Sequence, residues 1–264
     1  MSINTIFVVN SEDKPTAQSI YHYTLLRNDV HVWCASLVQP SDGLCELLSQ
    51  DERARADRFY FDRDRNRFIL SRGLLRMIIG CYLDINPTQI QFCYGPHGKP
   101  ALQTSFQNRT FYFNLSHSKD LVLFAFSWDH QVGIDIEYLR PISEAEYIAD
   151  HFFSYNESTL IRTINTKDKL DAFFKIWTSK EAYLKATGGG LTESLSEIDI
   201  SLTSTDSTHI ESINADRQKS ARWHLETIRP ASDYLATLAV EGHTPHIVFH
   251  QLLDQVLAIL PHSA

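Results

Sequence analysis

The chain has 264 residues, 43% of them hydrophobic and 21% charged, and a formal net charge of −8 at pH 7. This composition is typical of a globular protein and excludes a low-complexity chain, while the acidic balance argues against a general nucleic-acid-binding protein. The longest notable apolar run, residues 121–128, has the length of a strand. It falls short of the roughly 20 residues that a membrane span needs.

The cysteines and the N-terminus indicate a cytoplasmic protein. No two of the four cysteines form a CxxC pair, so reduced and buried thiols are expected. The N-terminus lacks a basic start followed by a long apolar segment, which predicts no secretory signal. Residues 1–28 are expected to form an N-terminal extension with no assigned role.

The first half of the chain is predicted to mix strands and helices without regular alternation. Period-two patterns predict strands, four-residue steps predict an amphipathic helix, and glycine with proline predicts a loop. In chain order these are a strand over 29–37, a helix over 42–59, an amphipathic helix over 66–83 with Arg72 and Arg76 on a separate face, a loop over 94–100, and strands over 109–118, 121–128 and 131–138. We expect the last two strands to form a hairpin around residues 129–130.

The second half has clearer helix boundaries. Two Ser-x-x-Glu matches predict helix starts, at Ser143–Glu146 and Ser154–Glu157. The strongest helix spans 168–186 and ends at the run Gly188–Gly190. Beyond it we expect a strand over 197–202, a polar exposed stretch over 203–220, and closing strands over 222–228 and 234–242. Because βαβ units do not recur, an α+β fold is predicted rather than a doubly wound sheet.

One segment of this acidic chain is rich in arginine. Residues 53–76 contain eight arginines and three aspartates, a local surplus of five positive charges. Such a surplus is expected to attract an anionic ligand or an acidic partner surface. The alternative is a solvated helix face with salt bridges, and the composition leaves both interpretations open.

Two acids lie close together in the stretch QVGIDIEYLRP, residues 131–141. In a strand, the three aliphatic residues share one face while Asp135 and Glu137 share the other, with a separation of roughly 6–7 Å along the strand. Like charges side by side are unfavourable unless a cation or a basic partner compensates them. Mg²⁺ prefers such oxygen ligands, so the pair predicts a metal site. An ordinary solvent-facing strand is the alternative.

A third acid is predicted on the strongest helix. Glu181 falls on one stripe with Phe173, Trp177 and Leu184, and Lys185 follows one turn later. A carboxylate on an apolar stripe needs a partner, unless it forms a plain Glu–Lys surface pair at the edge of the stripe. Added to the two strand acids, Glu181 completes a three-carboxylate site near the basic segment. This combination favours metal-assisted phosphoryl-type transfer.

These motifs resemble the signature of the 4′-phosphopantetheinyl transferases, in their larger, Sfp-type branch. The resemblance is carried by VGIDIE, by WTSKEAYLK with Glu181 46 positions after Asp135, by GKP (98–100), by FNLSHS (113–118), by the arginine-rich helix entry and by YLATLAV (234–240). It implies an α+β fold of two similar α/β halves packed as a pseudo-dimer within a monomer. The active site is then expected at the interface of the halves, here 29–120 and 121–264, with the metal site carried by the second.

The resemblance also implies a reaction and its catalytic residues. The phosphopantetheine arm of coenzyme A would pass to a serine of an acyl- or peptidyl-carrier protein, with release of adenosine 3′,5′-bisphosphate. Asp135, Glu137 and Glu181 would surround Mg²⁺, with Glu137 bound directly or through water. Glu181 would also be the general base, and Lys185, with Lys180, would steady negative charge at the phosphates.

The contacts to coenzyme A follow from the same resemblance. Ser116 and His117 would contact its phosphates, and Lys99 would lie near the nucleotide. Looser matches for the basic residues that hold the 3′-phosphate are Arg58, Arg63 and Arg67. The motif does not decide among these three.

Other signals lead to weaker alternatives. The stretch NLSHS lacks the G-x-S-x-G turn of a serine hydrolase, and the glycine run at 188–190 follows its helix, whereas a phosphate loop precedes one. Three histidines near Pro245 are expected to be surface or loop residues: His243, His246 and His250. Two functional alternatives remain open, a Mg²⁺-dependent hydrolase of a nucleotide pyrophosphate and a carrier-binding scaffold without catalysis.

Overall fold

The computed structural model describes residues 24–38, 43–106, 108–190, 194–203, 207–242 and 244–252. It contains two principal sheets and two short ribbons. The first sheet consists, in spatial order, of β11 (His246–Gln251), β1 (Asp29–Ser36), β5 (Leu121–Trp128) and β4 (Phe111–Ser118). The second consists of β6 (Val132–Tyr138), β10 (Tyr234–Glu241) and β9 (Trp223–Ile228). The ribbons pair β2 (Phe92–Tyr94) with β3 (Pro100–Leu102), and β7 (Ile198–Leu202) with β8 (Thr208–Ile213).

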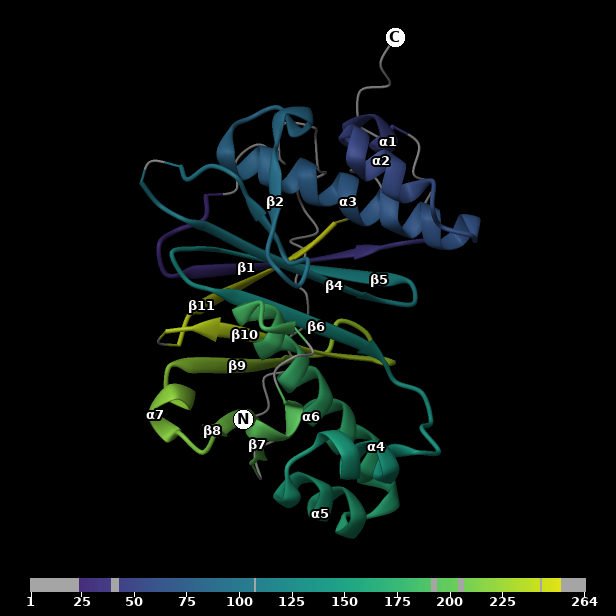
Figure 1. Ribbon diagram of the computed structural model, residues 1–264, viewed down its shortest axis with the longest axis vertical. Helices are drawn as coiled ribbons and strands as arrows, with labels where there is room; N and C mark the ends of the chain where they lie inside the picture. The colour runs from purple at the N-terminus through teal and green to yellow at the C-terminus, as the bar shows by residue number, and fades with distance from the viewer. Residues whose placement is uncertain are drawn as a thin grey trace, which may run out of the picture.

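Helices cover the two outer faces of the stacked sheets (Figure 1). On the first sheet lie α1 (Leu44–Leu47), α2 (Gln50–Ala56), α3 (Asp62–Leu83) and the 3₁₀ turn η2 (Pro87–Gln89). On the second lie α4 (Ala145–Phe152), α5 (Tyr155–Thr163) and α6 (Thr166–Thr187), with η4 (Leu195–Glu197) and α7 (Arg217–Ser220) nearby. Each half therefore combines one sheet with one helix of 22 residues, α3 or α6. The predicted α+β class with two similar halves is confirmed.

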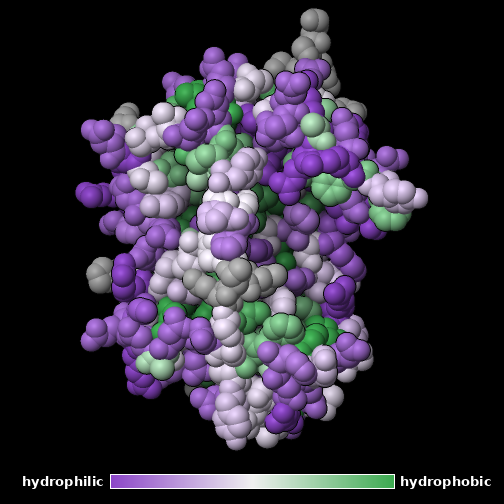
Figure 2. Space-filling view, in the orientation of Figure 1, coloured by the Kyte–Doolittle hydropathy of each residue, from purple (hydrophilic) through white to green (hydrophobic). Residues whose placement is uncertain are grey.

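Three hydrophobic clusters hold these layers together. One lies between the first sheet and α1–α3, and a second lies between α4–α6 and the second sheet. The third fills the space between the two sheets and contains Val132, Ile134 and Ile136. These three aliphatic residues are at most 1% exposed, so the predicted inward face of this strand is confirmed. No helix of the described residues is long and apolar enough to cross a membrane, and the face seen in Figure 2 is mostly hydrophilic.

The predicted hairpin between β5 and β6 is wrong. β5 pairs antiparallel with both β1 and β4 in the first sheet, whereas β6 pairs antiparallel with β10 in the second. Asp129 adopts a left-handed conformation, φ 62°, where the chain leaves one sheet for the other. A boundary at 120/121 would separate β4 from its partner β5, and we propose that the halves divide at residues 129–131.

Helix boundaries show where capping signals succeed and fail. The predicted box at Ser154 and Glu157 is confirmed, with the Ser154 N–H donating to Glu157 Oε2 at 2.7 Å. The one predicted at Ser143 is wrong, because α4 begins at Ala145 and has no side-chain cap. The predicted single helix over 42–59 is two helices, since Ser49 and Glu52 form a capping box that begins α2.

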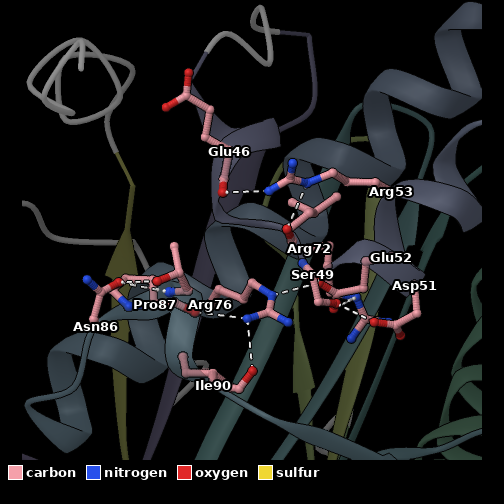
Figure 3. Close-up of polar contacts among 12 residues, drawn as sticks. Glu46, Ser49, Asp51, Glu52, Arg53, Arg72, Arg76, Asn86, Pro87 and Ile90 are labelled. Carbon is pink, nitrogen blue, oxygen red and sulfur yellow. Dashed lines mark hydrogen bonds and ion pairs between the residues drawn. The ribbon is translucent and has the colours of Figure 1, made fainter. Parts of the chain in front are cut away.

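The arginines on α3 divide into buried and exposed groups. Arg76 is 1% exposed and donates from Nε to Glu52 Oε2 at 2.7 Å, while Arg72 approaches the other oxygen of the same carboxylate at 3.3 Å. Arg76 also donates to the carbonyls of Pro87 and Ile90 (Figure 3). These two arginines therefore join α2 to α3 inside the protein. Part of the surplus positive charge of residues 53–76 is therefore neutralised by a buried carboxylate and does not reach the surface.

Two stretches of the C-terminal half contain more structure than expected. The predicted exposed stretch 203–220 includes β8 and α7. The segment around His246 and His250 is strand β11, which pairs parallel with β1 and completes the first sheet. His243 and residues 1–23 of the expected extension lie outside the described residues.

All four cysteines are free, as predicted, but only Cys34 is buried, and Cys93 is exposed.

β11 brings a histidine pair together inside the first sheet. His250 Nε2 lies 3.1 Å from His31 Nδ1, and the His250 ring stacks on Trp33 with centroids 4.4 Å apart. His31 Nδ1 is also 2.6 Å from Tyr82 Oη, and its Nε2 is 3.7 Å from Asp29 Oδ2. Burial lowers the pKa of both histidines to about 4, despite the attraction of Asp29 for a charged His31.

This pair predicts acid-sensitive stability. The pKa of an unfolded histidine is near 6.5, whereas the pKa of each of these two histidines in the folded chain is about 4. Between these two pH values the unfolded chain binds more protons than the folded chain, so the free energy of unfolding falls as the pH drops through this window. The loss for His31 is on the order of 3 kcal/mol. Urea unfolding at pH 7 and pH 5 should show a smaller difference for His250→Gln than for the wild type. The exposed His209→Gln is the control, and equal pH dependence in all three chains would contradict the prediction.

Candidate active site

The candidate site forms where α6 lies against β6. A Cβ atom on Gly133 would come within 2.0 Å of the Ala182 carbonyl oxygen and 2.3 Å of the Ala186 nitrogen. Only glycine allows the helix backbone to approach the strand this closely. The close approach places Glu181 and Lys185, which precede the two alanines on α6, on the side of β6 that carries Asp135.

Replacing Gly133 by alanine is therefore expected to destabilise the protein strongly. The clash is with backbone atoms, so α6 would have to move away from β6, at a cost of about 3 kcal/mol. Gly95→Ala is a matched control, since its added Cβ would lie 3.7 Å from the carbonyl oxygen of Lys99, in ordinary van der Waals contact. Urea unfolding of both variants measures the difference, and equal midpoints would contradict this role for Gly133.

Asp135 is the centre of the polar contacts. It is 4% exposed, and its Oδ1 accepts from Lys185 Nζ at 2.5 Å and from Ser116 Oγ at 3.0 Å. Lys185 Nζ also donates to Ser116 Oγ at 2.8 Å, which closes a triangle of three side chains. The other oxygen of Asp135, Oδ2, is buried and has no hydrogen-bond partner within the described part of the chain. A buried carboxylate oxygen in this condition is suited to a further positive ligand.

Two more carboxylates share this environment. Glu137 Oε2 accepts from Ser118 Oγ at 3.1 Å, and Glu181 lines a cavity together with Lys185. Burial raises the pKa of both glutamates, and the negative charge of Asp135 raises each of them further. The three acids therefore act on one another as like charges, and a cation placed among them would relieve this repulsion.

The three acids offer the oxygen ligands that a hard cation prefers, but they are not arranged as a preformed metal site. Among the described residues, no group of three His, Cys, Asp or Glu side chains is arranged as a ready metal site. Asp135 nevertheless offers a buried oxygen without a hydrogen-bond donor, and the glutamate carboxylates supply the oxygen ligands that Mg²⁺ prefers. The donor set suits Mg²⁺ completed by substrate phosphates and water, because this ion characteristically takes few ligands from the protein.

A cavity of about 220 Å³ opens beside Glu181 and Lys185, between the two halves of the chain. Its walls come from the 97–100 loop, β4 and the C-terminal end of α6, and include Lys99, Glu181 and Lys185. Lys99 Nζ donates to the carbonyls of Ala186 at 2.6 Å and Val132 at 3.4 Å, and burial lowers its pKa to about 8. Lys99 thus fastens the loop to α6 and β6 at the edge of the cavity.

A second group of basic residues lies toward α3. His117 is exposed on the face of β4 that looks to this helix, opposite to Ser116. Its pKa is lowered by the neighbouring side chains that displace water, and then by the positive charges of Lys185 and Arg67. Arg67 forms an ion pair with Asp120 at 2.7 Å. Lys185 and Arg67 both act electrostatically on His117, so the three residues form one positive region around the end of β4.

The remaining predicted arginines lie at the entry to α3. Arg63 is exposed and approaches Asp64 at 3.3 Å, while Arg58 is exposed in the turn between α2 and α3. Neither contacts the three acids or Lys185 within the described residues. The structure therefore groups Arg67 with His117 and leaves Arg58 and Arg63 on the outer surface.

Lys180 lies elsewhere, contrary to the sequence-based expectation. Its side chain is fully buried, with Nζ 2.7 Å from Glu157 Oε2 and donating to the carbonyls of Leu195 and Ile198. Burial lowers the pKa of Lys180, and the charge of Glu157 opposes this shift. Lys180 therefore ties α6 to α5 and β7, and it is not available to a phosphate.

Two polar residues of β4 were missed in the sequence. Asn114 Oδ1 accepts from the Ile134 N–H at 2.8 Å, and Ser118 Oγ accepts from the Tyr138 N–H at 3.0 Å. Both lie on the same face of β4 as Ser116. The signal was present in FNLSHS, where every second residue is polar.

Comparison with known proteins covers both halves. Residues 33–129 match the family model described as 4′-phosphopantetheinyl transferase, N-terminal, and residues 131–239 match that of the 4′-phosphopantetheinyl transferase superfamily. The two matches meet at the turn between β5 and β6, where the chain passes from the first sheet to the second.

Curated relatives agree with both matches. The chain is 44% identical over 222 residues to the 4′-phosphopantetheinyl transferase HetI of Nostoc sp. strain PCC 7120, covering 83% of this chain and 90% of the relative. It is 33% identical to the putative 4′-phosphopantetheinyl transferase slr0495 of Synechocystis sp., and the match covers 63% of this chain and 68% of the relative. It is 30% identical to the 4′-phosphopantetheinyl transferase Sfp of Bacillus subtilis, and the match covers 66% of this chain and 75% of the relative. The chain therefore belongs to the 4′-phosphopantetheinyl transferase superfamily, in its Sfp-type branch, and is a transferase that acts on carrier proteins.

Proposed function

We propose that this chain transfers the 4′-phosphopantetheine arm of coenzyme A to a serine of an acyl- or peptidyl-carrier protein, with Mg²⁺ required and adenosine 3′,5′-bisphosphate released. The observation that carries the proposal is the Asp135–Lys185–Ser116 triangle, which lies beside Glu181 at a cavity between the halves. Because β4 and β6 come from one chain, a single copy supplies both walls of the site. We therefore propose that the enzyme works as a monomer.

In the proposed reaction, the carrier serine oxygen attacks the phosphorus that bears the pantetheine arm. A new P–O bond forms to serine, and the pyrophosphate bond to the nucleotide breaks, so that adenosine 3′,5′-bisphosphate leaves with the bond electrons. The serine proton passes to Glu181, whose pKa is raised by burial and by Asp135, so its carboxylate is a stronger base than an exposed one. Lys185 offers its ammonium group to the negative charge on the phosphoryl oxygens.

Asp135, Glu137 and Glu181 would hold the Mg²⁺. When bound, the ion supplies charge neutralisation at the pyrophosphate. Ser116 orients Lys185 and Asp135 through the two hydrogen bonds that its hydroxyl makes with them. The relative position of Asp135 and Lys185 is therefore already restrained before the substrate binds.

The basic residues around the cavity are assigned to coenzyme A by charge and position. His117 lies near the end of β4, within electrostatic reach of Lys185 and Arg67, and His117 and Arg67 together suit a phosphate group of the nucleotide half. Lys99 lines the cavity and suits the nucleotide by holding the 97–100 loop in place. Arg58 and Arg63 are proposed for the outer edge, where they would attract an anion before it reaches the cavity.

The test is the mass of an apo-carrier protein after incubation with the enzyme. The carrier is expected to gain the phosphopantetheine mass only when coenzyme A and Mg²⁺ are both present, and EDTA should prevent the gain. Acyl-carrier and peptidyl-carrier domains should be tested side by side. No mass gain on any of them would overturn the proposal, and breakdown of coenzyme A without a carrier would favour a pyrophosphate hydrolase instead.

A further inference from the structure

The two halves meet at a seam in which side chains replace a strand ladder. β4 is the last strand of the first sheet and β6 is the last strand of the second, so each has one edge without a neighbouring strand in its own sheet. Edge strands leave backbone N–H groups without a ladder partner. Here the side chains of Asn114, Ser116 and Ser118, which we call the polar seam, accept from three N–H groups of β6.

The polar seam follows a two-residue repeat. Asn114 accepts from Ile134, Ser116 accepts from Ile136 at 3.4 Å, and Ser118 accepts from Tyr138. The residue before each of these N–H groups is Gly133, Asp135 or Glu137, respectively. Ser116 donates its hydroxyl proton to Asp135, and Ser118 donates its own to Glu137. Asn114 pairs with the N–H that follows Gly133, and it makes no hydrogen bond to a carboxylate within the described residues.

The two serines differ in what they hold. Ser116 shares its hydroxyl between Asp135 and Lys185, so a change there disturbs the ion pair as well as the acid. Ser118 contacts only Glu137 among the three acids, with Oγ to Oε2 at 3.1 Å. A hydroxyl has a single proton to donate, and Ser118 directs its proton at this carboxylate while its lone pair receives the Tyr138 N–H. The backbone of β6 thereby fixes the position of the hydroxyl, and the hydroxyl fixes the carboxylate.

We propose that Ser118 is a positioning residue that holds the Glu137 carboxylate for the metal, so that the joint between the two halves also sets the geometry of the acidic site. This inference rests on the proposed role of Glu137 as a metal ligand. Partners that hydrogen-bond to a ligating group restrict its orientation and contribute to metal affinity. Ser118 is well suited to this role, because it belongs to the opposite half and is itself held by the β6 backbone.

The test uses Mn²⁺ as the probe and measures binding rather than turnover. Mn²⁺ is titrated into the full chain with coenzyme A present and no carrier, and free Mn²⁺ is followed by electron paramagnetic resonance. Ser118→Ala is expected to weaken Mn²⁺ binding about tenfold. Ser118→Thr keeps a hydroxyl on a residue that strands accept, and it is expected to restore the affinity.

Asn114→Ala is the matched control for the seam itself. It removes a bond of the same kind, from a side chain to the β6 backbone, and Asn114 makes no hydrogen bond to a carboxylate within the described residues. Because Asn114 also lines the cavity with Glu181 and Lys185, its Mn²⁺ titration is repeated without coenzyme A. It should lower the thermal midpoint by an amount similar to Ser118→Ala while leaving Mn²⁺ affinity unchanged. Should Ser118→Ala fail to fold, Ser118→Cys keeps the side-chain volume with a much weaker donor, and the same loss of affinity is expected.

The outcomes separate this inference from the function it rests on. Equal Mn²⁺ affinity of the wild type and Ser118→Ala would overturn the positioning role alone. Equal weakening by Asn114→Ala and Ser118→Ala would also overturn it, because the loss would then come from the seam as a whole. No Mn²⁺ binding by the wild type would overturn the metal site of the proposed function, and this inference with it.

Discussion

Glu181→Gln is expected to abolish measurable transfer of phosphopantetheine, a loss in kcat of about 10²- to 10⁴-fold. Glutamine keeps the size of the side chain but cannot accept the serine proton, and it offers no negative charge to a cation. The measurement is the initial rate of mass gain on an apo-carrier at saturating coenzyme A and Mg²⁺. Glu144→Gln, an exposed position just before α4, is the matched control and should retain full activity.

The same variant should fold at least as well as the wild type. Burial and the charge of Asp135 raise the pKa of Glu181, so carrying the negative charge costs more free energy in the folded chain than in the unfolded one. Removing that charge relieves the penalty, and the free energy of unfolding at pH 7 is expected to stay equal or to rise. Near-normal turnover would exclude Glu181 as the base, whereas lost activity with a lost fold would leave the variant uninformative about chemistry and contradict the stability prediction.

Asp135→Ala is expected to weaken the binding of metal and coenzyme A together and to lower kcat/KM by about 10²-fold or more. Partners that only orient metal ligands already contribute 10- to 100-fold, so loss of a proposed ligand should cost at least as much. The variant also removes the carboxylate that pairs with Lys185 at 2.5 Å. Calorimetric titration of coenzyme A with and without Mg²⁺ measures both effects.

Stability separates the functional loss at Asp135 from a folding defect. The Lys185 side chain is 30% exposed, so water can take over part of its solvation once the carboxylate is gone. The cost in unfolding free energy is expected to be only about 1 kcal/mol. Asp135→Asn, which keeps an oxygen to accept from Ser116 and Lys185, should fold like the wild type and still lose metal affinity. Unchanged affinity for both ligands in either variant would mean that the acidic pair is not the metal site.

Local patterns predicted much of the second half because neighbouring residues decide them. Alternation along residues 132–137 correctly assigned the aliphatic face of β6. The helix predicted over 168–186 is α6, which ends at Gly188 in a left-handed conformation with φ 75°. The capping box at Ser154 and Glu157 is equally local. In each case the controlling interaction joins residues within one or two turns of one another.

Partner choice between distant segments was beyond the sequence. Adjacency of the two strands in the chain predicts a hairpin after β5, yet β6 pairs with β10, about 100 residues away. Strand β11 was missed because its parallel pairing with β1 depends on residues more than 200 positions apart. Pairing of this kind is decided by burial of whole faces and not by the local pattern.

The two lysines on α6 illustrate the same division most clearly. The sequence alone determined that Lys180 and Lys185 lie on one helix, and helical geometry separates their directions by about 140°. Only the tertiary structure decided that Lys185 meets Asp135 at the cavity while Lys180 is buried against Glu157. What the sequence determined were the chemical groups and their places along each strand and helix. The packing of β4, β6 and α6 decided which of these groups come into contact. The direction of a side chain on its own helix or strand selects a partner only after the separate elements have packed together.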